Sequence, residues 1–231
     1  MYSVSDNLDS WLAWLVWLLL AFPTIITQRR NRRQQTFFCE DDYSCYLELM
    51  AQFCRVEEVE IWAYCLMPNH IHLIAAPKSA DGLRLAIGEA HRRYTRHIDF
   101  RQGWRGHLWQ GRFAWFVLDE PYLLTAARYV ELNPVRAGLV NAPSDYRWSS
   151  AAAHLEGQDD ALVRVKPLLE VAPDWRRLLT SVIPEEELRI LRAHDLTGRP
   201  LGDQAFLIGL EQKLGKVLRR QKPGPKPKKT I

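Results

Sequence analysis

Cysteine is scarce in this sequence, with four residues among 231 and no Cys-x-x-Cys pair. This number and spacing argue against a small disulfide framework and against a cysteine-rich zinc site. The four thiols are those of Cys39, Cys45, Cys54 and Cys65. We interpret all of them as packing residues of a protein that works in a reducing cytoplasm.

A strong overall charge is also lacking, because the formal net charge is only +4. The basic side chains are nevertheless clustered in 29–35, in 84–112 and in the lysine-rich C-terminal tail. Clustered cations favour a polyanionic partner, of which nucleic acid is the most common, although each cluster is equally consistent with a solvated surface. A composition of 47% hydrophobic and 25% charged residues is that of a folded globular protein.

No apolar run reaches the roughly 20 residues of a typical membrane-spanning helix. Residues 11–26 form the longest run, and a basic segment follows it directly. The run has three interpretations: a membrane anchor, a buried or interfacial helix, and an atypical start from a misread or rearranged reading frame. Residues 1–23 are therefore set apart as an atypical apolar N-terminal segment.

Hydrophobic periodicity divides the rest of the chain into strands and helices. Strands are predicted at 24–29, 59–66, 70–76 and 112–118. Helices are predicted within 41–59, 79–100 and 119–140, and Pro134 limits the last of them because the residue before proline avoids the helical conformation. From about residue 156 the pattern changes, and two short helices around a glycine-containing turn predict a helix-turn-helix-like appendage in 156–231.

Two histidines lie two positions apart in an apolar segment, directly after the turn-like Pro68-Asn69. Side chains alternate between the faces of a strand, so His70 and His72 share one face while Ile71 points to the other. Two imidazoles on one face can chelate a divalent metal ion. Taken alone, the pattern fits two ordinary half-buried histidines better than a metal site.

A tyrosine and an asparagine four residues apart add to this pattern. Tyr129 and Asn133 would share one face of a helix. An amide oxygen can complete the coordination of an ion, and a phenol can attack an electrophile that the ion polarises. The spacing also suits a core aromatic residue and a turn residue before Pro134, and Tyr94 is a rival nucleophile nearer in sequence to the histidines.

Three segments of the chain resemble the single-tyrosine HUH transposases, and more narrowly the REP-associated tyrosine transposases of the IS200-like group. They are YCLMPNHIHLIAAP (64–77), GHLWQGRF (106–113), and ARYVELNPVRAGLV together with DYRWSS (127–150). The resemblance covers about residues 24–155, which are interpreted as the transposase domain. It implies an α+β, ferredoxin-like domain with a central antiparallel sheet, which bears the histidines, and helices packed on one face.

The same resemblance implies roles for individual residues. His70, His72 and Asn133 would hold a divalent ion, Mg²⁺ or Mn²⁺, and Tyr129 would be the nucleophile. The implied activity is metal-dependent cleavage and rejoining of single-stranded DNA at REP-like hairpins through a 5′-phosphotyrosine link, which is the chemistry of DNA transposition.

Basic and aromatic residues are expected to bind the DNA. Arginines would neutralise backbone phosphates, and tryptophans could stack on unpaired bases or serve as packing anchors. The arginines are Arg29, Arg32, Arg33, Arg92, Arg93, Arg96, Arg105 and Arg112. The tryptophans are Trp104, Trp109 and Trp115.

The first strand departs from the family pattern, because Arg30 occupies the position where a glycine is expected. This departure favours an alternative in which the chain is an inactive DNA-hairpin-binding protein or a decayed mobile-element relic. The sequence leaves open whether the chain forms a homodimer and whether residues 11–26 attach it to a membrane.

Overall fold

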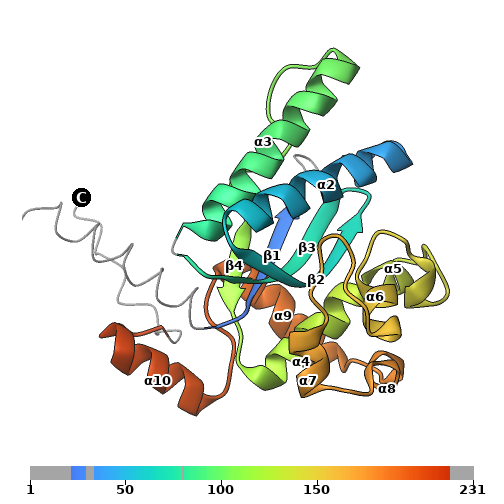
Figure 1. The fold of residues 1–231 in the computed structure, drawn as a ribbon. Helices are drawn as coiled ribbons and strands as arrows, with labels where there is room; N and C mark the ends of the chain where they lie inside the picture. Colours follow the sequence, from blue (N-terminus) through green and yellow to red (C-terminus); the bar gives the residue numbers. More distant parts are fainter. Residues whose placement is uncertain (1–21, 30–33, 80, 219–231) are drawn as a thin grey trace, which may run out of the picture.

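The computed structural model describes residues 22–29, 34–79 and 81–218. Its centre is a four-stranded antiparallel sheet with the strand order β2-β3-β1-β4 (Figure 1). The strands are β1 (Thr24–Arg29), β2 (Val59–Met67), β3 (His70–Pro77) and β4 (Ala114–Val117). The four predicted strands are therefore confirmed, and β4 is shorter than expected.

Helices connect the strands in a βαββαβ order. They are α2 (Glu40–Val56) between β1 and β2, and α3 (Gly82–Gln102) between β3 and β4. This order of elements and strands is that of a ferredoxin-like domain, as the sequence predicts. β2 and β3 form a hairpin whose turn is Pro68-Asn69.

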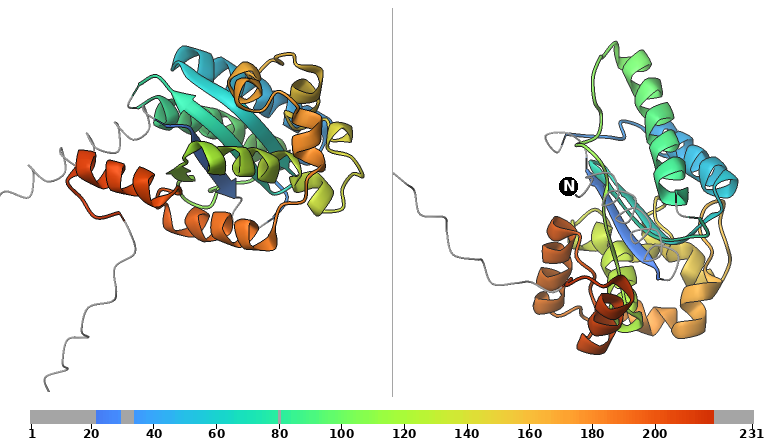
Figure 2. Two further views of the ribbon diagram at one scale, coloured as in Figure 1. Left: turned by 90° about the horizontal axis from the view of Figure 1, so that it is seen from below. Right: turned by 90° about the vertical axis from the view of Figure 1, so that its left-hand side faces the viewer.

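Helices cover both faces of the sheet, so the expectation of helices on one face is wrong. One face packs against α2 and α3, and the other packs against α4 (Glu120–Glu131), which follows β4 (Figure 2). The apolar alternation of the strands explains this arrangement, because Ile26 and Ile71 point to the first cluster while Ile25 and Ile74 point to the second.

Further helices follow α4 along the chain. They are α5 (Asn133–Arg136), η2 (Pro143–Asp145), α6 (Ala151–Glu156), α7 (Lys166–Val171), α8 (Trp175–Thr180), α9 (Glu185–Thr197) and α10 (Gln204–Leu214). α9 packs against α4 and β4, whereas Leu210 and Leu214 of α10 pack with Val117 in a separate small cluster. Both helices therefore contact β4, and the helix-turn-helix-like appendage stays a prediction.

The four cysteines are free thiols. Cys54 and Cys65 are buried in the core, as expected of packing residues, and Cys45 is half-buried. Cys39 is exposed and precedes the first turn of α2, so the expectation of packing is wrong for this residue.

Most of the apolar segment 11–26 lies outside the described residues, as do Arg30, Arg32 and Arg33. Among the described residues, no helix combines the length and hydrophobicity needed to cross a membrane.

Candidate active site

The two histidines lie on the face of the sheet that α4 covers. Their ring centroids are 4.9 Å apart, and Ile71 between them belongs to the cluster on the opposite face. The alternation predicted from the sequence is therefore confirmed. β3 is an inner strand paired on both sides, so the backbone that carries these side chains is held by two neighbouring strands.

Hydrogen bonds orient both imidazole rings. The Nδ1 atom of His72 lies 3.0 Å from the hydroxyl of Thr27, which is the residue opposite His72 on β1. The Nδ1 atom of His70 lies 2.5 Å from the amide oxygen of Asn69. With Nδ1 occupied in each ring, Nε2 is the nitrogen that can serve as a ligand.

Burial keeps the histidines neutral. It lowers the pKa of His70 to about 4, and the positive charge of Arg29 acts in the same direction. Burial also holds the pKa of His72 well below its usual range, with further contributions from His70 and Arg29. Neutral imidazoles retain the lone pair that a metal ion requires, so this environment suits ligation at neutral pH.

Tyr129 and Asn133 meet the histidines from α4 and the start of α5. The ring of Tyr129 lies edge-on to the ring of His72, with the centroids 5.4 Å apart. The Nδ2 atom of Asn133 lies 3.4 Å from Nε2 of His70. The helix ends between the two residues, at Glu131, but Leu132 still donates to the carbonyl oxygen of Arg128, so both side chains remain on the histidine side.

Arg136 is a site residue that the sequence reasoning missed. It donates a hydrogen bond to the backbone oxygen of Tyr129 at 2.8 Å, and its guanidinium carbon lies 4.4 Å from the centroid of the Tyr129 ring. This cation–π geometry holds the phenol in one orientation. The sequence offered a signal in the seven-residue spacing, because residues two helical turns apart lie on the same side of a helix.

The donor set fits a divalent ion that accepts both nitrogen and oxygen ligands. Two neutral imidazoles stand beside an amide whose oxygen can turn toward the same space. Within the described part of the chain, no three His, Cys, Asp or Glu side chains gather in a way that could hold a metal. A site here would therefore depend on the amide and on the substrate for its remaining ligands.

The rival nucleophile Tyr94 lies elsewhere. Its side chain is fully buried in the cluster with α2, on the opposite face of the sheet from the histidines, and its hydroxyl donates to the backbone oxygen of Thr36. The structure therefore brings only Tyr129, of these two tyrosines, to the histidine pair.

The expected DNA-binding arginines fall into two groups. Arg29 is bound to Asp195 of α9 at 2.9 Å, and Arg92 and Arg93 are both bound to Glu89. The others are exposed and form no salt bridge with any residue that the structure describes. They are Arg96, Arg105 and Arg112.

The tryptophans that were expected to stack on bases differ in their exposure to solvent. Trp109 is buried against His91, and Trp115 is half-buried, so both act in packing. Trp104 is 42% exposed, and Phe100, which the sequence reasoning missed, is 91% exposed. Phe100 and Trp104 line an open hollow on α3 together with Arg96.

Comparison with known proteins identifies the family to which this chain belongs. The model of the family described as "Transposase IS200 like" matches residues 24–133. A Haemophilus influenzae protein provisionally described as a REP-associated tyrosine transposase is 30% identical over 143 residues, which are 57% of this chain and 78% of that protein. The chain therefore belongs to the IS200-like transposases, and among them to the REP-associated tyrosine transposases.

Two solved structures are similar in part. A REP-associated tyrosine transposase bound to a REP hairpin is 21% identical, with a TM-score of 0.48, and the match covers 62% of this chain and 87% of that one. A Deinococcus radiodurans protein provisionally described as a transposase is 19% identical, with a TM-score of 0.36, and the match covers 47% of this chain and 88% of that one.

Proposed function

We propose that this transposase cleaves and rejoins single-stranded DNA beside REP-like hairpins through a covalent 5′-phosphotyrosine link, in the presence of Mg²⁺ or Mn²⁺. The observation that carries the proposal is the meeting of Tyr129 and Asn133 with the histidine pair, from segments far apart in the sequence. We assign this activity to the domain of residues 24–155.

His70, His72 and Asn133 would hold the ion. When bound, a divalent ion at this place polarises the scissile phosphate and neutralises its charge. Thr27 and Asn69 orient the two imidazoles through Nδ1, and burial keeps both rings neutral. The chain thus presents preformed ligands without having to expel a proton from either ring.

Tyr129 would carry out the covalent step. Its phenol oxygen gives up its proton and forms a bond to phosphorus, the bond from phosphorus to the 3′ oxygen breaks, and the 3′ oxygen takes up a proton to become a free hydroxyl group. Attack by a 3′-hydroxyl on the phosphotyrosine reverses the step and joins two strands without another energy source. Arg136 would keep the ring of Tyr129 in place during both steps.

Exposed basic and aromatic residues would bind the strand that leads to the site. Arg96, Arg105 and Arg112 are free of salt bridges among the described residues, so they can neutralise phosphates without first losing a partner. Phe100 and Trp104 offer faces on which unpaired bases can stack.

The experiment incubates the purified full chain with a labelled oligonucleotide that folds into a REP-like hairpin with a single-stranded extension. With Mn²⁺ we expect a protein–DNA adduct that survives denaturing electrophoresis, and with EDTA we expect none. Tyr129→Phe should abolish the adduct, whereas Tyr94→Phe should retain it. An adduct in Tyr129→Phe would overturn the assignment of the nucleophile.

The alternative is a chain that binds hairpins without cleaving them. Hairpin binding with no adduct in any divalent metal would favour that alternative and would reject the enzymatic proposal.

A further inference from the structure

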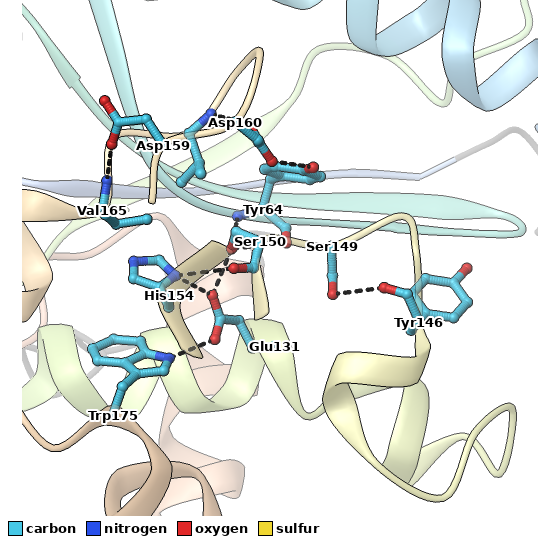
Figure 3. A network of polar contacts seen from close by, with 11 residues as sticks. Tyr64, Glu131, Tyr146, Ser149, Ser150, His154, Asp159, Asp160, Val165 and Trp175 are labelled. Atoms are coloured by element: carbon cyan, nitrogen blue, oxygen red, sulfur yellow. Dashed lines mark hydrogen bonds and ion pairs between the residues drawn. The ribbon is translucent and has the colours of Figure 1, made fainter. Parts of the chain in front are cut away.

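A buried polar network lies behind the candidate nucleophile. Glu131 is the last residue of α4, two positions after Tyr129 and two before Asn133. Its carboxylate is completely buried and accepts three hydrogen bonds, from Ser150, His154 and Trp175 (Figure 3). The donors lie 2.5 Å, 2.7 Å and 2.8 Å from the carboxylate oxygens.

The network connects α4 to the sheet. The hydroxyl of Ser150 also accepts from the backbone N–H of Tyr64, at 3.0 Å, and the backbone N–H of Ser150 donates to the Tyr64 oxygen at the same distance. Cys65, the next residue of β2, lies opposite His72 in the sheet. A short path of hydrogen bonds therefore runs from the end of the tyrosine helix to the strand that pairs with the histidine strand.

Glu131 is an unfavourable choice for this position by local rules. A buried carboxylate loses its hydration, and a negative charge at the C-terminal end of a helix opposes the helix dipole. An apolar side chain would fill the same space without those costs. Three directional hydrogen bonds fix the carboxylate, and with it the junction of α4 and α5, in one place, which apolar packing does not do.

We propose that Glu131 is a positioning residue for the reaction. Held by Ser150, His154 and Trp175, it sets where the α4–α5 junction lies against the sheet, and thereby sets the distance of Tyr129 and Asn133 from His70 and His72. The Glu131 carboxylate bonds to Ser150, His154 and Trp175 and not to His70 or His72, so its role is to position other groups. This inference rests on the proposed function, since it assigns a role in the reaction that Tyr129 would perform.

The test compares the rate of adduct formation with DNA binding and folding in Glu131→Gln. The amide keeps the size of the side chain but replaces one acceptor by a donor, so the bonds from Ser150, His154 and Trp175 cannot all be kept. At saturating hairpin DNA and Mn²⁺ we expect adduct formation to slow by about 10- to 100-fold, as small displacements of reacting groups do. Hairpin affinity should stay within about threefold of wild type, because the arginines that contact phosphates lie elsewhere.

Two further variants separate positioning from stability. Trp175→Phe removes one hydrogen bond while keeping an aromatic ring, and should slow adduct formation less than Glu131→Gln does. Tyr64→Phe is the matched control, because it removes the nearby bond between the Tyr64 hydroxyl and Asp160 but leaves the bonds of Glu131 intact. Its adduct rate should equal that of wild type even if its melting temperature falls.

The outcomes distinguish this inference from the proposed function. If wild type forms no adduct with any divalent metal, the proposed function fails. If wild type forms the adduct and Glu131→Gln forms it equally fast, the positioning role is wrong. If Glu131→Gln does not fold, an unchanged adduct rate in folded Trp175→Phe would equally overturn the role, and a slowed one would support it.

Discussion

Thr27 shows how a single side chain can influence the whole site. Its hydroxyl is the partner of His72 Nδ1, and both groups are buried between the sheet and α4. Outer partners of this kind orient a ligand ring, and their loss typically costs about 10- to 100-fold in metal affinity or activity.

Thr27→Val is therefore expected to weaken the binding of the divalent ion that the proposed reaction requires. Valine keeps the branched shape that the strand favours but cannot bond to Nδ1, so the ring of His72 loses its orientation. We expect the Mn²⁺ concentration for half-maximal adduct formation to rise by about 10-fold or more. Thr27→Ser, which keeps the hydroxyl, should stay near wild type, and equal values for the two variants would argue against the orienting role.

Local patterns explain which parts of the site the sequence could predict. Strand alternation placed His70 and His72 on one face. Pro134 was expected to limit the helix, and α4 does end at Glu131, but Asn133 before the proline is itself helical, in α5.

Glu131 was missed because its partners Ser150, His154 and Trp175 lie on distant segments, which no periodicity reports. Arg136 was missed although its seven-residue spacing from Tyr129 is a helical one. Local patterns also predicted the four strands, whereas the ferredoxin-like fold was implied by the family resemblance, which gave helices on one face and did not predict α4 on the second face of the sheet.

At the scale of elements, α2 and α3 are joined by a buried histidine. His91 of α3 lies 2.9 Å from the hydroxyl of Tyr46 on α2 and stacks on Trp109 with the ring centroids 4.3 Å apart. Burial lowers the pKa of His91 to about 3. An unfolded chain binds a proton at this residue near pH 6.5, whereas the folded chain does not, so acid favours unfolding.

The stability of the wild-type chain should consequently fall as the pH drops from about 6.5 toward about 3. His91 alone contributes a loss of about 2 kcal/mol in the free energy of unfolding between pH 7 and pH 5. His91→Gln can keep a hydrogen bond to Tyr46 but does not titrate. When unfolding by urea is measured in EDTA, its free energy of unfolding should therefore lose about 2 kcal/mol less than that of wild type between pH 7 and pH 5. The exposed variant His107→Gln is the control, and an equal pH dependence in wild type and His91→Gln would contradict the assignment.

At the scale of the whole molecule, the distribution of arginines predicts how DNA binding responds to salt. Each phosphate that a protein neutralises releases counterions, so the logarithm of affinity falls with the logarithm of salt concentration by nearly one per contact. Arg96 and Arg105 form no salt bridge with the residues that the structure describes, so they are available for such contacts, whereas Arg92 is already bound to Glu89.

The double variant Arg96→Gln with Arg105→Gln should reduce the salt slope of hairpin binding by about 2. Arg92→Gln, on the same helix as Arg96, is the control and should change the slope by less than one. The measurement is a series of hairpin titrations between about 50 and 200 mM salt. An unchanged slope in the double variant would place the DNA on another surface.

The strand order has a consequence for how this protein is made. Of the strands that the structure describes, β1 is synthesised first, yet it lies inside the sheet, between the histidine strand and β4, which comes much later in the chain. Pairings between distant segments form slowly and only when both segments are available. Until β4 has left the ribosome, β1 lacks its outer neighbour, and Tyr129 follows β4 in the chain, so the proposed nucleophile becomes available only after the strands that complete the sheet.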